Sequence, residues 1–295
     1  MSQMESDYDI ALSVEHVSKR FLVPQVRGWR ASDALLHPMA FVKESFFGEP
    51  FWALQDINLS IRRAEFFGII GQNGSGKSTL LRIMSNLSLP TSGSVTASGR
   101  IASLLDLGSG FHPRATGREN AYMNGLFMGL SKQEIREKIP EIIRFAELEA
   151  FADRPMRTYS WGMTLRLSFA VAVHVRPDIL IVDEVLAVGD ADFQEKCFDH
   201  FEALKRAGVT IVLVSHDMFS IERFAKRVAL IDHGRIVSIG EPRQIIAQYL
   251  TQLAERSPGA RRALERALAA WRQNDSSQAL IPEDVIAAKA REGQR

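Results

Sequence analysis

The most constraining feature of the sequence is a glycine-rich segment between an apolar run and a helical stretch. Glu65 to Ile70 has the pattern of a short buried strand, and Lys77 to Asn86 has that of a helix. The turn between them matches the pattern G-x-x-x-x-G-K-[ST], with the residues Gly71, Gln72, Asn73, Gly74, Ser75, Gly76, Lys77, Ser78 and Thr79. A strand, this loop and a helix in that order predict an α/β unit that binds phosphate groups.

The residue types in this loop suit a nucleoside triphosphate. Glycines let backbone N–H groups turn inward around phosphates, and the start of the following helix adds a partial positive charge. Lys77 is expected to reach the β and γ phosphates, and the Ser78 hydroxyl is expected to ligate Mg²⁺. A glycine-rich turn without a ligand is the alternative interpretation.

Two acidic residues follow the apolar run Ile179 to Val182. Asp183 is expected to hold Mg²⁺, and Glu184 is expected to polarise the attacking water. Ligands of open α/β sheets bind at the carboxyl ends of the strands, so these acids should lie near the phosphate loop. A helix cap or a solvated acidic pair is the alternative.

The remaining apolar runs predict a parallel sheet covered on both faces. Thr210 to Ser215 and Val228 to Asp232 read as buried strands separated by helical sequence. Ile10 to Phe21 and Trp52 to Ile61 read as two further strands, because apolar positions alternate in them.

Two capping boxes predict a helical insertion. Thr116 is followed three residues later by Glu119, and Ser131 by Glu134. Both pairs precede helical patterns, and we expect a helical subdomain over residues 112–165.

A third motif narrows the class of nucleotide-binding protein. The segment Thr158-Tyr-Ser-Trp-Gly-Met-Thr-Leu-Arg166 precedes the acidic strand and resembles the signature, usually LSGGQ, of the ABC transporter ATPases. The resemblance covers Ile10 to about Tyr249. It implies a P-loop NTPase fold with a RecA-like parallel core, an antiparallel β subdomain and a helical insertion. It also implies ATP hydrolysis by a homodimer, in which Ser160, Gly162 and Met163 of one copy complete the partner's ATP site.

The resemblance assigns three more residues. Asp190, in Val188-Gly-Asp190, has the spacing of the family's D-loop. His216 is expected to contact the γ-phosphate and to orient water together with Glu184, with a helix cap as the alternative role. Phe21 occupies the place of the aromatic residue that stacks on adenine; Trp52 as the stacking residue and a core position for Phe21 are the alternatives.

Departures from the common pattern point to one subfamily. The family's usual glutamine is absent near Asp106 or Leu107, so Asp106 or a water molecule would take its role, or the role is lost. The segment from Leu104 to Pro113, the following TGREN and the signature YSWGM together resemble the ATPases of polysaccharide exporters. This implies a separate transmembrane permease and a lipid-linked substrate of the O-antigen, capsular or teichoic acid type. An ATPase of another ABC transporter and a soluble ABC clamp are the alternatives.

The domain organisation expected from these patterns is one ATPase domain over residues 1–250 and a short helical tail over 251–295. Residues 22–51 form a family-specific insert, with a short amphipathic helix around Ser32 to Phe47. We hypothesise that Trp29, Phe41, Phe46 and Phe47 face the membrane partner or the lipid end of the substrate. A helix packed on the sheet is the alternative. The tail is too short for the β-sandwich that some of these ATPases carry.

Composition limits the partners. The 36 Lys and Arg nearly balance the 35 Asp and Glu, leaving a formal charge of +1, so no overall field attracts nucleic acid. No apolar run approaches the roughly 20 residues of a membrane-spanning helix. The single cysteine, Cys197, is expected to be a buried structural thiol. We expect a peripheral protein on the cytoplasmic face of the membrane.

Overall fold

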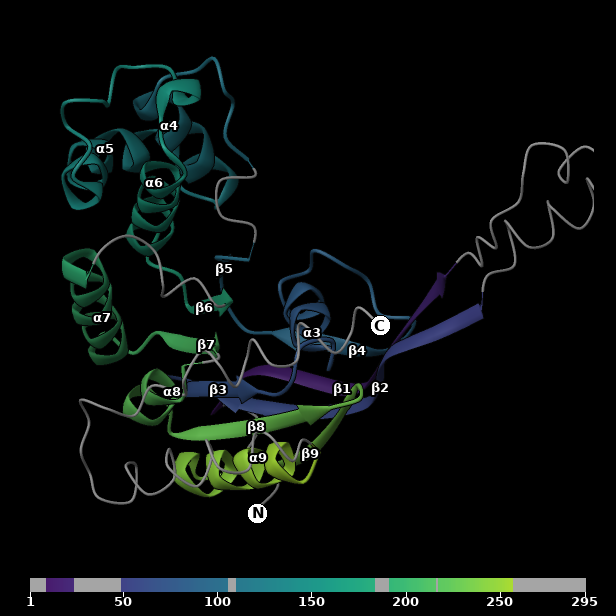
Figure 1. Ribbon diagram of the computed structural model, residues 1–295. Helices are drawn as coiled ribbons and strands as arrows, with labels where there is room; N and C mark the ends of the chain where they lie inside the picture. Colours follow the sequence, from purple (N-terminus) through teal and green to yellow (C-terminus); the bar gives the residue numbers. More distant parts are fainter. Residues whose placement is uncertain (1–8, 24–48, 106–109, 184–190, 216, 257–295) are drawn as a thin grey trace, which may run out of the picture.

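The computed structural model describes residues 9–23, 49–105, 110–183, 191–215 and 217–256, which form two β-sheets and several helices (Figure 1). The helix expected around Ser32 to Phe47 lies outside these residues. In the described ranges, no helix combines the length and the apolar character that crossing a bilayer requires.

The larger sheet has the strand order β5-β6-β7-β3-β8-β9. Its strands are β3 (Phe66–Ile70), β5 (Ile101–Ser103), β6 (Ile179–Asp183), β7 (Thr210–Val214), β8 (Arg227–Asp232) and β9 (Arg235–Gly240). Strands β5, β6, β7, β3 and β8 run parallel to one another, and β9 is antiparallel to β8. The expected parallel core is therefore confirmed.

Alternate residues of β3 enter two different apolar cores. Phe66 and Ile70 pack with side chains from α7 (Ala191–Arg206), α8 (Met218–Phe224) and α9 (Pro242–Arg256) on one face of the sheet. Phe67 and Ile69 pack with α3 (Lys77–Met84) and the smaller sheet on the other face. Because both faces are covered, every position of β3 is buried, which explains its continuous apolar sequence.

The smaller sheet is antiparallel, with the order β2-β1-β4, and contains β1 (Ile10–Val23), β2 (Glu49–Arg62) and β4 (Ser92–Ala97). Pairing of β1 with β2 continues to Val23 and Glu49, beyond the strand ends expected from the sequence. The strands therefore include the outer residues of the expected 22–51 insert. Figure 1 shows this ribbon projecting from the body of the protein.

The helical subdomain contains α4 (Gly117–Phe127), α5 (Lys132–Ala146), a 3-10 turn (Met156–Thr158) and α6 (Trp161–His174), and it lies apart from α3 (Figure 1). Both expected capping boxes are present, at Thr116 and at Ser131. The subdomain has its own apolar core, to which α6 contributes Leu167 and Val171. Phe169 and Val173 of the same helix enter the core under the large sheet. The second half of α6 thus fastens the subdomain to the sheet.

Two features differ from the sequence expectations. Strand β9 was not predicted; it follows a tight turn in which His233 and Gly234 have φ values of 45° and 74°. Positive φ at both central residues is typical of two-residue hairpin turns, and the alternating pattern of Arg235–Gly240 was the available signal. Helix α9 runs through the expected boundary after Leu250 and ends at Arg256.

Candidate functional site

The phosphate loop lies at the carboxyl end of β3, where two glycines touch neighbouring backbone. Gly76 has φ 107°, and a Cβ there would lie 2.6 Å from the carbonyl oxygen of Ala53. A Cβ on Gly71 would collide with the carbonyl group of Ile231. Any larger residue would therefore displace the loop, so its path depends on these glycines.

Lys77 is buried inside this loop although it carries an ammonium group. Its Nζ donates hydrogen bonds to the carbonyl oxygens of Gly71 at 2.8 Å and Gln72 at 2.9 Å. The hydroxyl of Ser75 is buried without a hydrogen-bond partner in the described part of the chain. Helix α3 begins at Gly76 with no side-chain cap. A buried cation, a lone hydroxyl and uncapped helix N–H groups together fit the phosphates of a nucleotide.

The turn between β8 and β9 supports the loop from behind. The N–H of Gly234 donates to Ser75 O at 2.9 Å, and Gly234 O accepts from the N–H of Gln55 at 2.8 Å. A Cβ on Gly234 would lie 2.6 Å from Ala53 O, so this position also requires glycine. Sequence reasoning missed Gly234 because its contact with the loop depends on the β8–β9 hairpin.

Asp183 ends β6 at the same edge of the sheet. Val214 on β7 is in register with Asp183 on one side and with Ile69 on the other, so Asp183 lies two strand spacings, about 10 Å, from Ile69, which precedes the phosphate loop by two residues. The Asp183 carboxylate and the Ser78 hydroxyl are hard oxygen donors of the kind that Mg²⁺ prefers. This donor set fits a magnesium ion bound to the phosphates.

Three expected site residues, Glu184, Asp190 and His216, lie outside the described residues, and their roles stay predictions. The structure does identify the residue that caps α8. The Asp217 carboxylate accepts from the N–H groups of Phe219 at 3.0 Å and Ser220 at 3.2 Å. Because Asp217 is the N-cap of α8, the helix cap considered as the alternative role of His216 is provided by Asp217.

The signature segment starts α6 in the helical subdomain. Ser160 is the N-cap, and its Oγ accepts from the N–H of Met163 at 3.2 Å. Ser160 is exposed, and a Cβ on Gly162 would meet only Ser160 Oγ, at 3.9 Å. The structure thus brings the phosphate loop and Asp183 to one sheet edge, and it leaves Ser160, Gly162 and Met163 in a separate subdomain (Figure 1).

The residues considered for adenine stacking lie on the β1–β2 ribbon. Phe21 is opposite Phe51 and Trp52 is opposite Arg20 in the ladder. Both Phe21 and Trp52 are exposed, which excludes a core position for Phe21. Trp52 directly precedes Ala53, whose carbonyl lies against Gly76. The assignment of Phe21 as the adenine contact stays a prediction.

The segment expected to lack the usual glutamine, residues 106–109, lies outside the described residues, but the loop that follows it is fixed by Asn120. This fully buried side chain accepts from the N–H of His112 at 2.6 Å and donates to the carbonyls of His112, Ala115 and Thr116. The sequence indicated Asn120 only as part of TGREN, because its hydrogen bonds depend on how the loop folds back.

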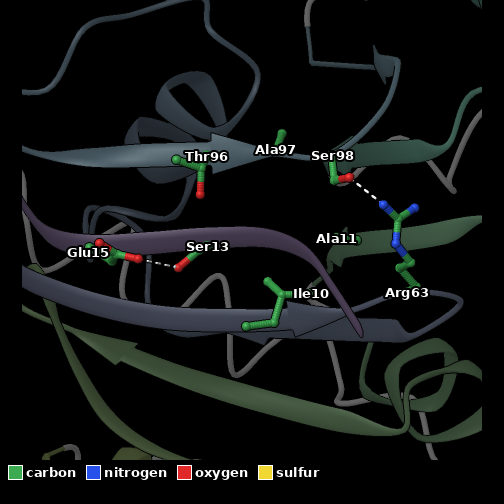
Figure 2. Close-up of a pocket in the computed structure, with 8 residues that line it drawn as sticks. All are labelled: Ile10, Ala11, Ser13, Glu15, Arg63, Thr96, Ala97 and Ser98. Atoms are coloured by element: carbon green, nitrogen blue, oxygen red, sulfur yellow. Dashed lines mark hydrogen bonds between the residues drawn. The ribbon is translucent and has the colours of Figure 1, made fainter. Parts of the chain in front are cut away.

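Two hollows lie away from the phosphate loop. One, of about 410 Å³, lies on the antiparallel sheet. There the Ser13 hydroxyl donates a hydrogen bond to the Glu15 carboxylate, and the Arg63 guanidinium donates one to the Ser98 hydroxyl (Figure 2). The other, of about 650 Å³, lies between α4 and α5 and is lined by His112, Arg118, Tyr122, Met123, Arg136 and Ile139. Neither hollow includes a residue of the phosphate loop.

Comparison with known proteins agrees with this geometry. The sequence profile of the ABC transporter family matches residues 54–187. The O-antigen export system ATP-binding protein RfbB of Klebsiella pneumoniae is 43% identical over 82% of this chain and 98% of that protein. RfbB of Myxococcus xanthus is 45% identical over 81% of this chain, which spans 55% of that longer protein.

A solved structure shares the fold. The ATP-binding cassette MJ0796, determined as a dimer in a post-hydrolysis state bound to ADP and Pi, superposes with a TM-score of 0.63 at 25% identity. The match covers 78% of this chain and 98% of that one. The P-loop architecture expected from the sequence is thereby confirmed.

Proposed function

The chain belongs to the ABC transporter family, and from that premise we propose that it is the ATP-hydrolysing subunit of an exporter for a lipid-linked polysaccharide. The class of substrate would be O-antigen, capsular polymer or teichoic acid. The observation that carries the proposal is the divided site, with a phosphate loop at one sheet edge and the exposed start of the signature helix in another subdomain. Similarity to O-antigen export proteins over most of the chain supports the substrate class.

Two copies arranged head to tail would complete two ATP sites. In each site, Lys77 and the N–H groups of the phosphate loop bind the phosphates of ATP from one copy, and Ser160 and Gly162 approach from the other. Ser78 and Asp183 would hold Mg²⁺, which neutralises phosphate charge when bound.

The chemical step needs a base and a group that orients water. Glu184 accepts a proton from the attacking water, and His216 holds that water and the γ-phosphate in position. Closing around ATP and reopening after hydrolysis would move the membrane partner.

That partner is a separate transmembrane permease, and the chain would act at the cytoplasmic face of the membrane. The hollow between α4 and α5 is a suitable contact, because Tyr122, Met123 and Ile139 give it an apolar lining outside the ATP site. The segment that includes Trp29 and Phe41 is a second candidate contact. Replacing residues 26–48 by a short Gly–Ser turn is expected to abolish export and to preserve ATP hydrolysis; unchanged export rejects that role.

The proposed function is tested by Glu184→Gln. This variant should bind ATP, accumulate as a closed dimer and lose about 10²- to 10⁴-fold in turnover, the usual contribution of a general base. Phosphate release and sedimentation velocity measure the two effects. Glu195→Gln, an exposed acid on α7, is the matched control. Turnover at the parental rate in Glu184→Gln would contradict the assignment.

A further inference from the structure

The start of α6 is not held by the apolar core of its own subdomain. Each of the residues from Trp161 to Arg166 is exposed or only half-buried, and burial begins at Leu167. The position of Ser160 and of the first helical turn therefore depends on the chain that precedes them. That chain is the segment 151–159, in which Met156 is buried.

Residues 112–118 lie beside residues 151–157, and the two segments together form a joint. Four backbone hydrogen bonds connect them, and each segment donates two. The bonds run from Met156 to Ala115 and from Arg157 to Pro113, both at 2.9 Å, from Gly117 to Arg154 at 3.3 Å, and from Arg118 to Ala152 at 2.9 Å. The path of residues 112–118 thus sets the path of the chain that leads into Ser160.

The side chain of Asn120 holds one half of the joint in place. This fully buried amide accepts from the N–H of His112 and donates to the carbonyl oxygens of His112, Ala115 and Thr116. The carbonyl oxygen of Ala115 accepts both from Asn120, at 3.2 Å, and from the N–H of Met156, at 2.9 Å. Because one atom accepts both bonds, a displacement of the Asn120 side chain reaches the segment before α6 directly.

The residue just before Ser160 also packs on the joint. The hydroxyl of Tyr159 donates to Phe151 O at 2.7 Å. A Cβ on Gly117 would collide with that hydroxyl and would lie 3.0 Å from the ring carbon that carries it. The absence of a side chain at Gly117 is therefore what allows Tyr159 to take this position.

We propose that Asn120 is a positioning residue for the ATP site, because it fixes the joint that places Ser160 and Gly162. The inference rests on the proposed function, in which those two residues meet the ATP held by a second copy. Hydrogen bonds weaken steeply when donor and acceptor are misaligned, so a shift in the start of α6 costs contacts with the phosphates. Since Asn120 is fully buried, it acts through Ser160 and not on ATP itself.

Asn120→Ala in the Glu184→Gln background tests the proposal. MgATP-dependent dimerisation, measured by sedimentation velocity, should weaken by about tenfold or more, because a misplaced binding group loses its contacts. Binding of a fluorescent ATP analogue to the dilute monomer should not change. Ile142→Ala is the matched control, since Ile142 is fully buried in the core of the same subdomain but lies on α5, outside the joint.

The control separates positioning from stability. Equal dimerisation of Asn120→Ala and Ile142→Ala shows that Asn120 only stabilises the subdomain, which overturns this inference and leaves the proposed function intact. Loss of ATP binding by the Asn120→Ala monomer places its effect outside the signature segment and also overturns the inference. If the Glu184→Gln protein itself does not dimerise with MgATP, the proposed function fails together with this inference.

A second set of variants tests the joint even if Asn120→Ala does not fold. Gly117→Ala should displace Tyr159 and weaken dimerisation, and adding Tyr159→Phe should recover part of the loss, because the colliding hydroxyl is then gone. Tyr159→Phe alone is the control for the lost bond to Phe151 O. A double variant that dimerises no better than Gly117→Ala contradicts the role of the joint and, with it, that of Asn120.

Discussion

The phosphate loop and the start of α6 are both predicted to contact a triphosphate, the loop in its own copy and α6 in the partner's site, but the structure builds them differently. The loop is supported from behind by β2 and the β8–β9 turn, and its Lys77 is only 5% exposed. Ser160 and Trp161 lie at the surface of a separate subdomain. There the Ser160 hydroxyl accepts a hydrogen bond from the N–H of Met163 in the helix that it caps. In the proposed dimer, one half of each site is built within one chain, and the other half comes from the second copy.

The two helix starts also share a feature that α4 and α5 lack, although the first turns of α8 and α9 have it too. The first turns of α3 and α6 contain no acidic residue, whereas α4 and α5 carry Glu119 and Glu134 there. Acidic residues at these positions stabilise a helix by neutralising the positive end of its dipole. The absence of that charge at α3 and α6 leaves both helix starts electropositive, as phosphate binding requires.

The largest effect that separates the two halves is expected from alanine at their glycines. Gly76→Ala would place a Cβ 2.6 Å from Ala53 O at a φ of 107°, which should cost about 1–3 kcal/mol of unfolding free energy and abolish ATP binding. Gly162→Ala should leave stability unchanged or slightly increased, because its Cβ meets only Ser160 Oγ and alanine favours helix.

Urea unfolding and nucleotide titration would measure both variants. Gly162→Ala should bind ATP as a monomer but dimerise less well, because the added methyl group occupies the surface that faces the second copy. If Gly162→Ala lost ATP binding in the monomer, or if Gly76→Ala kept it, the division of the site between two copies would be wrong.

A smaller difference is expected between two serine caps. Ser160 and Ser131 have nearly identical backbone angles, and each accepts from the N–H three residues later at 3.2 Å. Replacing either by alanine should cost about 1 kcal/mol of unfolding free energy, the usual value of an N-cap. Only Ser160→Ala should also weaken ATP-dependent dimerisation, since only that hydroxyl is proposed to face phosphate. Equal dimerisation of the two variants would mean that Ser160 is a cap and nothing more.

The parts of the site that sequence predicted are those encoded locally. The phosphate loop and the caps at Thr116 and Ser131 each depend on residues within a few positions of one another. The buried strands were also predictable, because a sheet covered on both faces requires continuous apolar runs. Local patterns of this kind give the same loop, cap or strand in any fold that buries their apolar residues.

The parts that sequence missed depend on contacts between distant segments. Gly234 supports Ser75 only because the β8–β9 hairpin folds under the loop, and nothing near Gly234 in the sequence indicates that contact. The Asn120 side chain makes its four hydrogen bonds only when residues 112–116 turn back over it. Strand β9 had an alternating pattern, but an exposed edge strand has a weak apolar signal.

The last prediction concerns the contact between α6 of the helical subdomain and α7 beside the large sheet. His174 of α6 stacks on His200 of α7 with ring centroids 5.8 Å apart, and Phe145 of α5 lies edge-on 5.3 Å from each ring. Burial lowers the pKa of both His174 and His200 below the ordinary value of 6.5, and for His200 the neighbouring His174 lowers it further. Near the pair, Glu141 favours protonation, while Lys138 and Arg176 oppose it at His174.

The sign of the resulting pH dependence follows from the lowered pKa values. Below about pH 6.5 the unfolded chain binds protons that the folded histidines do not, so stability should fall on acidification, by at most about 1.4 kcal/mol per histidine per pH unit. His200→Phe should reduce this slope, because phenylalanine keeps the packing and removes one titrating group. Urea unfolding at pH 7.5 and 5.5 measures the slope, with His233→Asn, an exposed histidine of the β8–β9 turn, as the control. A His200→Phe protein with the full parental slope would show that His200 does not contribute to the acid sensitivity.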